Sequence, residues 1–94
     1  MFVVRETFTC KPGKASQLAK LFKDVMSDMP RMKPRVSTDF IGNFNTVVLE
    51  TEASDLGEFE KTMQDYMSRQ DLRDKMKGYT ELYQAGKREV FKVV

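Results

Sequence analysis

The sequence predicts an α+β protein of the ferredoxin-like class, in which a βαββαβ order builds a four-stranded antiparallel sheet with helices on one face. Segments with the two-residue alternation of strands and segments with the 3.6-residue period of helices follow one another in that order. The chain has no internal repeat and no linker, and its 94 residues suit one domain. We therefore expect residues 1–94 to fold as a single unit.

The first strand and the first helix are the clearest elements. Residues 2–10 alternate bulky and polar side chains and are rich in β-branched and aromatic types, which predicts a strand. A Pro-Gly pair in residues 11–14 ends it in a turn. Apolar residues then recur at helical spacing over residues 15–29, and Pro30 ends this helix because proline cannot continue the hydrogen-bond ladder.

A hairpin is predicted next, with strands over residues 35–41 and 44–52 and a turn at Gly42 and Asn43. In its second strand, the apolar run Val47-Val48-Leu49 interrupts the alternation. Apolar residues on both faces indicate a sheet that is covered on both sides. Helices cover one face, so we expect a second copy of the chain to cover the other, which makes the protein a homodimer.

The C-terminal half is predicted to hold two helical segments and a last strand. Ser54 is the expected N-cap of a helix with an apolar stripe. Apolar residues then recur at spacings of four, three and four, which predicts a further helix over residues 71–85 with Gly86 as its C-cap. Residues 89–94 complete the sheet. The stripe consists of Leu56, Phe59, Met63, Tyr66 and Met67.

Charge and composition exclude several classes of protein. The formal net charge of +2 is too small to indicate a nucleic-acid partner or an acidic membrane. No apolar run approaches the roughly 18 residues that span a bilayer, and the N-terminus lacks the pattern of a signal peptide. With no histidine and with Cys10 as the single cysteine, only carboxylates remain as metal ligands. We expect a cytoplasmic protein without metal or other cofactor, in which Cys10 is inert.

Three segments resemble a known group of proteins. Residues 7–14 are similar to the first strand of NIPSNAP-like proteins, which leads through Lys-Pro-Gly-Lys into an amphipathic helix. Residues 86–91 resemble the closing strand of the same group. Residues 47–50 resemble the related antibiotic-biosynthesis-monooxygenase-like proteins. In order and spacing, the resemblance covers nearly the whole chain.

The resemblance implies a dimeric α/β barrel, in which two sheets join face to face and small ligands occupy cavities beside them. It also implies mixed functions: cofactor-independent oxygenases, haem-degrading enzymes, isomerases, and members without known activity. This chain has neither histidine nor tryptophan. It therefore lacks the usual axial haem ligand, the histidine acid–base residue and the tryptophan of several oxygenase sites.

Glu6 is the candidate catalytic residue. It lies between Val4 and Phe8 on one face of the first strand, where an apolar residue is expected. A carboxylate in such surroundings would have a raised pKa and would be poised for proton transfer. The alternative is a structural carboxylate at a wet sheet edge, paired with an arginine. The candidate partners are Arg5, Arg35 and Arg88.

Five residues are candidates for binding a small apolar or aromatic ligand. Three tyrosines fall on helical faces that are predicted to meet the sheet, where their hydroxyl groups could bond a ligand in a cavity. Phe8 shares the face of Glu6, and Asp39 beside the hairpin turn could polarise a ligand. The alternative for the tyrosines is core packing with the hydroxyl group at the rim. The tyrosines are Tyr66, Tyr79 and Tyr83.

Two classes of function therefore stay open. The first is a small-molecule-binding dimer that acts as a cofactor-independent oxygenase or isomerase on an aromatic or polyketide-like substrate. The second is a non-catalytic interaction or regulatory module. A ligand-sized cavity lined by tyrosine, methionine and phenylalanine, with one buried carboxylate, would favour the first class. A sheet–helix interface packed without voids would favour the second.

Overall fold

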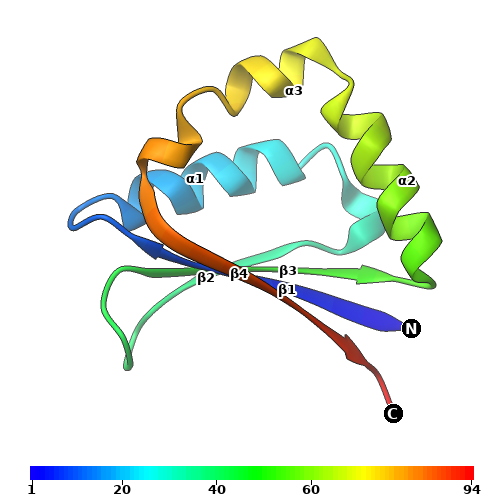
Figure 1. The fold of residues 1–94 in the computed structure, drawn as a ribbon, viewed down its shortest axis with the longest axis horizontal. Coiled ribbons are helices and arrows are strands. Elements are labelled where there is room, and N and C mark those ends of the chain that lie inside the picture. Colours follow the sequence, from blue (N-terminus) through cyan, green and yellow to red (C-terminus); the bar gives the residue numbers. More distant parts are fainter.

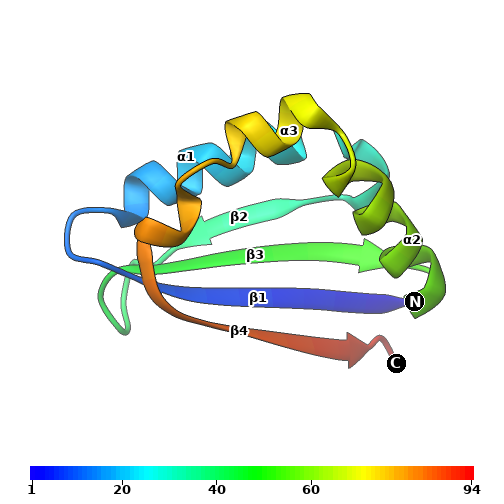
Figure 2. The same cartoon turned by 45° about the horizontal axis from the view of Figure 1, so that its top comes forward.

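A computed structural model describes all 94 residues and has the predicted ferredoxin-like architecture. Four antiparallel strands form one sheet in the order β2-β3-β1-β4, and all the helices lie on one face of it (Figures 1 and 2). No helix is both long enough and apolar enough to cross a membrane. The elements are β1 (Phe2–Cys10), α1 (Ala15–Met26), the 3₁₀ turn η1 (Pro30–Met32), β2 (Arg35–Thr38), β3 (Thr46–Ala53), α2 (Leu56–Met67), α3 (Gln70–Lys75), the 3₁₀ turn η2 (Tyr79–Glu81) and β4 (Tyr83–Lys92).

Register decides which side chains of the sheet meet the helices. Glu6 in the central strand β1 lies opposite Leu49 of β3 and Arg88 of β4. Because directly opposite residues point to the same face, these three side chains share the helix side of the sheet. Val4 and Phe8, two positions to either side of Glu6, are buried there. Glu6 is therefore a carboxylate in a row of core residues.

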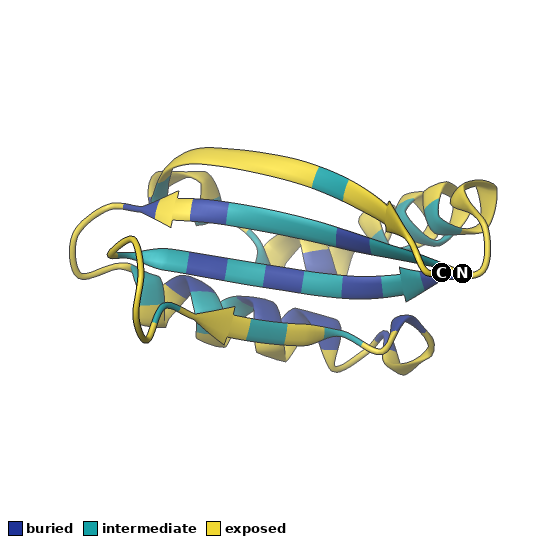
Figure 3. Cartoon of the chain, turned by 90° about the horizontal axis from the view of Figure 1, so that it is seen from below, coloured by how far each residue is buried: buried dark blue, intermediate teal, exposed yellow.

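The core lies between α1 and the two central strands. Leu18 of α1 is fully buried, and Val47 of β3 is fully buried beneath the helices. Seen from below, β1 and β3 carry the buried residues, and the edge strands β2 and β4 are mostly exposed (Figure 3). The buried residues contributed by α1 are Leu18, Phe22, Val25 and Met26.

The opposite face of the sheet, which we call the outer face, is not covered by any element of the chain (Figure 3). As predicted, Val48 points to this face, since its neighbours Val47 and Leu49 are buried on the helix side. Thr7 and Ser37 lie directly opposite it on the neighbouring strands, and the charged side chains nearby on this face pair among themselves. The Arg5 guanidinium lies 3.1 Å from the Glu50 carboxylate, and the Arg35 guanidinium lies 3.7 Å from the same carboxylate.

The first helix and the hairpin are shorter than predicted. The helix ends at Met26, so residues 27–29 were wrongly included. Strand β2 ends at Thr38, and residues 39–45 form a loop rather than a two-residue turn. The N-cap of α2 is Asp55 and not Ser54, because the Asp55 carboxylate accepts a hydrogen bond of 2.7 Å from the Glu58 backbone N–H.

The predicted helix over residues 71–85 is wrong beyond its first third. Helix α3 ends at Lys75, and Gly78 adopts φ +82°, a left-handed conformation that stops a helix. Tyr83 already belongs to β4, where it pairs with Cys10. The apolar spacing that predicted one helix instead comes from three different elements whose side chains pack in or against the core. Leu72 and Met76 lie at the short helix, Tyr79 lies in the 3₁₀ turn and Tyr83 lies in the strand.

Gly86 is consequently a strand residue and not a helix C-cap. It lies opposite Phe8, and a Cβ atom at this position would be 3.2 Å from the Phe8 ring. That ring cannot easily shift, because the rings of Phe22 and Tyr83 lie 5.1 and 4.9 Å from it. The glycine therefore provides the space that the ring occupies.

Replacing Gly86 by valine is expected to lower the free energy of unfolding by about 1–3 kcal/mol, because the added side chain would crowd the buried Phe8 ring. Urea denaturation would measure it. Ala85→Val is the matched control, because Ala85 is exposed like Gly86 but points to the other face of β4, away from the Phe8 ring. That change should stay within about 0.5 kcal/mol. Equal stability of the two variants would contradict the proposed role of Gly86.

Candidate functional site

A cavity of about 670 Å³ lies between the helix side of the sheet and the helices α2 and α3. Its floor comes from β1, β3 and β4, and its far wall comes from α1. Its size falls in the range of small-molecule sites, and its lining is mainly apolar. The lining residues that matter below are Glu6, Phe8, Phe59, Met63, Tyr79 and Arg88.

Helix α2 forms the roof of this cavity and is held loosely. None of its 12 residues is buried, whereas α1, of the same length, buries four. Its apolar stripe faces the cavity through Phe59 and Met63, and Leu56 and Met67 at its two ends are 46% and 49% exposed. An amphipathic helix normally buries its apolar face against the core. Here the apolar face of α2 lines a space that a ligand can occupy.

Two charged residues lie on the floor of the cavity. An Arg88 guanidinium nitrogen is 3.4 Å from a Glu6 carboxylate oxygen. The Glu6 side chain is 19% exposed and that of Arg88 is 54% exposed, so the carboxylate is the more enclosed partner. The Arg88 guanidinium also lies 5.7 Å from the centre of the Phe59 ring, within reach of a cation–π contact. Arg88 thus connects the sheet floor with the helix roof.

Tyr79 adds a hydroxyl group to the same cavity. Burial raises the pKa of Tyr79, and the neighbouring Tyr83 and the negative charge of Glu6 raise this pKa further. The phenol therefore stays protonated at neutral pH and can donate a hydrogen bond. The Phe8 ring completes this end of the cavity. The site combines a carboxylate, a guanidinium and a phenol with an apolar enclosure.

The structure brings together three of the six predicted site residues. Glu6, Phe8 and Tyr79 line the cavity. Tyr83 packs behind them, with its ring centre 4.9 Å from that of Phe8 in an edge-to-face contact and 5.8 Å from that of Tyr79. Tyr66 and Asp39 lie elsewhere.

Tyr66 and Asp39 both make contacts that stabilise the backbone. The Tyr66 hydroxyl group donates a hydrogen bond of 2.6 Å to the backbone carbonyl of Asp28, which ties the end of α2 to the end of α1. The Asp39 carboxylate accepts a hydrogen bond of 2.9 Å from the Thr46 backbone N–H, which closes the loop between β2 and β3. Neither residue lines the cavity that contains Glu6.

Arg88 and Phe59 are the cavity residues that sequence reasoning missed. Arg88 was considered only as an ion-pair partner of Glu6, because the last strand was expected to begin at residue 89. Extending that strand to Tyr83 places Arg88 opposite Glu6. Phe59 was assigned to an apolar stripe, whose spacing does not distinguish a core face from a cavity wall.

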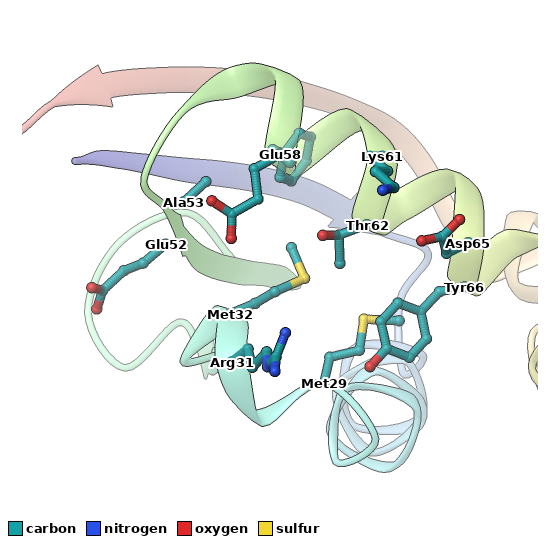
Figure 4. A pocket seen from close by; sticks show the side chains of 11 residues that line it. Met29, Arg31, Met32, Glu52, Ala53, Glu58, Lys61, Thr62, Asp65 and Tyr66 are labelled. Atoms are coloured by element: carbon teal, nitrogen blue, oxygen red, sulfur yellow. The ribbon is translucent and has the colours of Figure 1, made fainter.

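A second cavity of about 450 Å³ lies on the other side of α2, against η1 and the end of β3 (Figure 4). It is lined by charges of both signs, including Arg31, Lys61 and Glu58, together with Thr62 and Tyr66. Because its walls are more polar and it contains no enclosed carboxylate–phenol pair, the larger cavity is the better candidate site.

Cysteine and metal chemistry find no support in the geometry. Burial raises the pKa of the Cys10 thiol, so the reactive thiolate is disfavoured. No three side chains of histidine, cysteine, aspartate or glutamate lie close enough together to hold a metal ion. The chemistry of the site therefore rests on Glu6, Arg88 and Tyr79.

No protein-family model matches the chain, and no curated protein matches it significantly. Solved structures with the same fold do match over nearly the full length. One is Atu4242 from Agrobacterium tumefaciens, described as a NIPSNAP family protein of unknown function. It is 16% identical, with a TM-score of 0.88 over 100% of this chain and 94% of that one.

Two further structures extend the comparison. An uncharacterised NIPSNAP domain protein from Burkholderia xenovorans is 14% identical, with a TM-score of 0.82 over 100% of this chain and 95% of that one. A protein from Chloroflexus aurantiacus, provisionally assigned as an antibiotic biosynthesis monooxygenase, is 13% identical, with a TM-score of 0.76 over 99% and 92% of the two chains. The predicted likeness to both groups is thus confirmed for the fold.

Proposed function

We propose that the chain binds a small, largely apolar molecule in the cavity between the sheet and α2. The observation that carries this proposal is the 670 Å³ space lined by methionine, phenylalanine and tyrosine, with the enclosed Glu6 carboxylate on its floor. A packed sheet–helix interface would have favoured a non-catalytic module instead. The ligand needs an apolar body, and its polar end must meet Glu6, Arg88 and Tyr79.

The same three groups suit a cofactor-independent isomerisation of a carbonyl compound, aromatic or polyketide-like. Glu6 would accept a proton from the carbon beside the carbonyl group, and Tyr79 and Arg88 would stabilise the negative charge on the carbonyl oxygen. Returning the proton to another carbon completes the isomerisation without net oxidation. The Arg88 guanidinium lies 3.4 Å from the Glu6 carboxylate and so holds it on the floor of the cavity, where a ligand would meet it.

Self-association through the outer face is part of the proposal. That face is an uncovered sheet surface on a chain of 94 residues, a size at which added burial contributes much to stability. Its charges already pair within the chain, as Arg5 does with Glu50, so a facing copy would bury few unpaired charges. The cavity lies on the opposite side of the sheet and would stay open in such a dimer.

Methionine methyl NMR can test the binding site directly. Five of the seven methionines line the cavity, and Met1 and Met32 do not. Titration with a set of aromatic carbonyl compounds should shift the five cavity methyl signals and leave the other two in place. The five are Met26, Met29, Met63, Met67 and Met76.

Met63→Trp should fill the cavity and abolish these shifts, because the larger side chain occupies the ligand space. Thr62→Trp is the matched control, since the adjacent Thr62 lines the second cavity (Figure 4). Shifts confined to Met29 and Met32, which border the second cavity, would place binding there and contradict the proposal. Unchanged spectra with every compound would do the same.

A further inference from the structure

The loop between β2 and β3 carries the most exposed large apolar residues within the folded part of the chain. Phe40, Ile41 and Phe44 are 97%, 91% and 84% exposed. We call these three residues the hairpin tip. Single exposed apolar residues are ordinary, but three together on one loop mark a contact surface.

The loop is held in a defined position. The Thr46 backbone N–H donates to the Asp39 carboxylate at 2.9 Å, and the Asp39 backbone N–H donates to the Thr46 carbonyl at 3.1 Å. The Thr46 hydroxyl group donates a hydrogen bond of 2.8 Å to the Asn43 carbonyl. The ends of the loop are therefore pinned, which presents the tip without a large loss of entropy on binding.

The tip projects past the outer face of the sheet. In Figure 1 the connection between β2 and β3 descends below the sheet, on the side away from the helices. Any body packed against the outer face must therefore meet this loop. Because the residues that would meet it are apolar, the loop can add to such a contact rather than block it.

A second copy of this chain fits that position better than a membrane does. The loop over residues 39–45 contains one charged residue, the acidic Asp39, and no lysine or arginine to attract anionic lipid. The outer face also offers apolar contacts, since Phe91 and Val93 near the C-terminus are 42% and 45% exposed. In a two-fold arrangement each copy would offer both its tip and this surface to the other.

The dimensions of the sheet support the same partner. The four strands have 4 to 10 residues each and, at about 3.3 Å per residue and about 4.8 Å between strands, give a flat area of roughly 500 Å². A stable interface typically buries about 800 Å² per partner. The sheet alone falls short of this value, and the three tip side chains can supply the remainder.

We propose that the hairpin tip docks on the outer face of a second copy and acts as the arm of a homodimer. This inference rests on the self-association proposed above. Replacing Phe40, Ile41 and Phe44 together by serine should weaken the dimer at least tenfold in sedimentation equilibrium. Met67→Ser, which removes a half-exposed apolar side chain on the helix side, is the control and should leave the dimer unchanged.

A single tryptophan provides a second measurement that does not depend on the triple variant folding. The chain has no tryptophan, so Phe44→Trp introduces a unique fluorophore at the tip. Its emission should shift to the blue as concentration rises through the dimerisation range. If the dimer is stable but the tryptophan emission stays solvent-like, the tip does not dock, although the dimer itself stands. A triple-serine variant that dimerises normally would lead to the same conclusion.

Two other outcomes would overturn the inference for different reasons. A wild-type chain that stays monomeric up to high micromolar concentration would overturn the self-association together with the role of the tip, but would leave ligand binding in the cavity untouched. An emission shift that appears only with phosphatidylserine-containing vesicles would assign the tip to a membrane surface instead.

Discussion

Leu18→Ala is expected to lower the free energy of unfolding by about 2–5 kcal/mol, as for other leucines truncated in a core. Leu18 of α1 has no exposed surface and packs in the core against the central strands, so its truncation removes buried apolar contacts and leaves a cavity. A domain of this size is stabilised by only about 5–14 kcal/mol in total. Urea denaturation monitored by far-UV circular dichroism would measure the loss.

Met67→Ala provides the comparison for this prediction, because Met67 is also apolar and helical but 49% exposed at the end of α2. Its truncation should cost less than about 1 kcal/mol. The difference between the two losses of stability tests whether α1 stabilises the fold through the core while α2 only covers a cavity. Equal losses from the two substitutions would mean that α2 packs as tightly as α1, which would remove the cavity.

The elements for which several local signals agree were predictable from sequence. Strand β1 has its predicted bounds because alternation, a Pro-Gly turn and a following helical period all agree. Residues 71–85 failed because apolar spacings of three and four residues arise equally from a helix and from a helix, turn and strand in succession. The positive φ of Gly78 decided between them, and glycine tolerates that conformation without requiring it.

The residues of the candidate site were likewise predictable only where the signal lies within one element. Glu6 stood out because a carboxylate interrupted a row of core residues within one strand. Arg88 did not, because its place opposite Glu6 depends on pairing across 82 positions of sequence, which no local pattern reports. The cavity itself was not predictable, since the stripe on α2 would look the same if it were packed against the sheet.

Glu6→Gln is expected to separate stability from function. The free energy of unfolding should change by less than about 1 kcal/mol, because the partner Arg88 is 54% exposed and water solvates it when the carboxylate is removed. An arginine fully buried at this point would instead make the substitution cost about 3–5 kcal/mol. Thermal melting at neutral pH distinguishes these two outcomes.

The functional effect should be much larger. If Glu6 is the base, bound carbonyl compounds will exchange hydrogen for deuterium at the carbon beside the carbonyl group in heavy water, and Glu6→Gln should slow this exchange about 10²–10⁴-fold. The amide has nearly the same shape as the carboxylate but cannot accept the proton, so binding can persist while exchange is lost.

Glu50→Gln is the matched control for this experiment. Glu50 is 21% exposed, close to the 19% of Glu6, and it also forms ion pairs, with Arg5 and Arg35, but it lies on the outer face away from the cavity. Its substitution should leave the deuterium exchange unchanged. Equal slowing in both variants would show that removing any enclosed carboxylate disturbs the sheet. Marked destabilisation by Glu6→Gln alone, with unchanged exchange in the remaining folded protein, would assign Glu6 to structure and leave the cavity without a base.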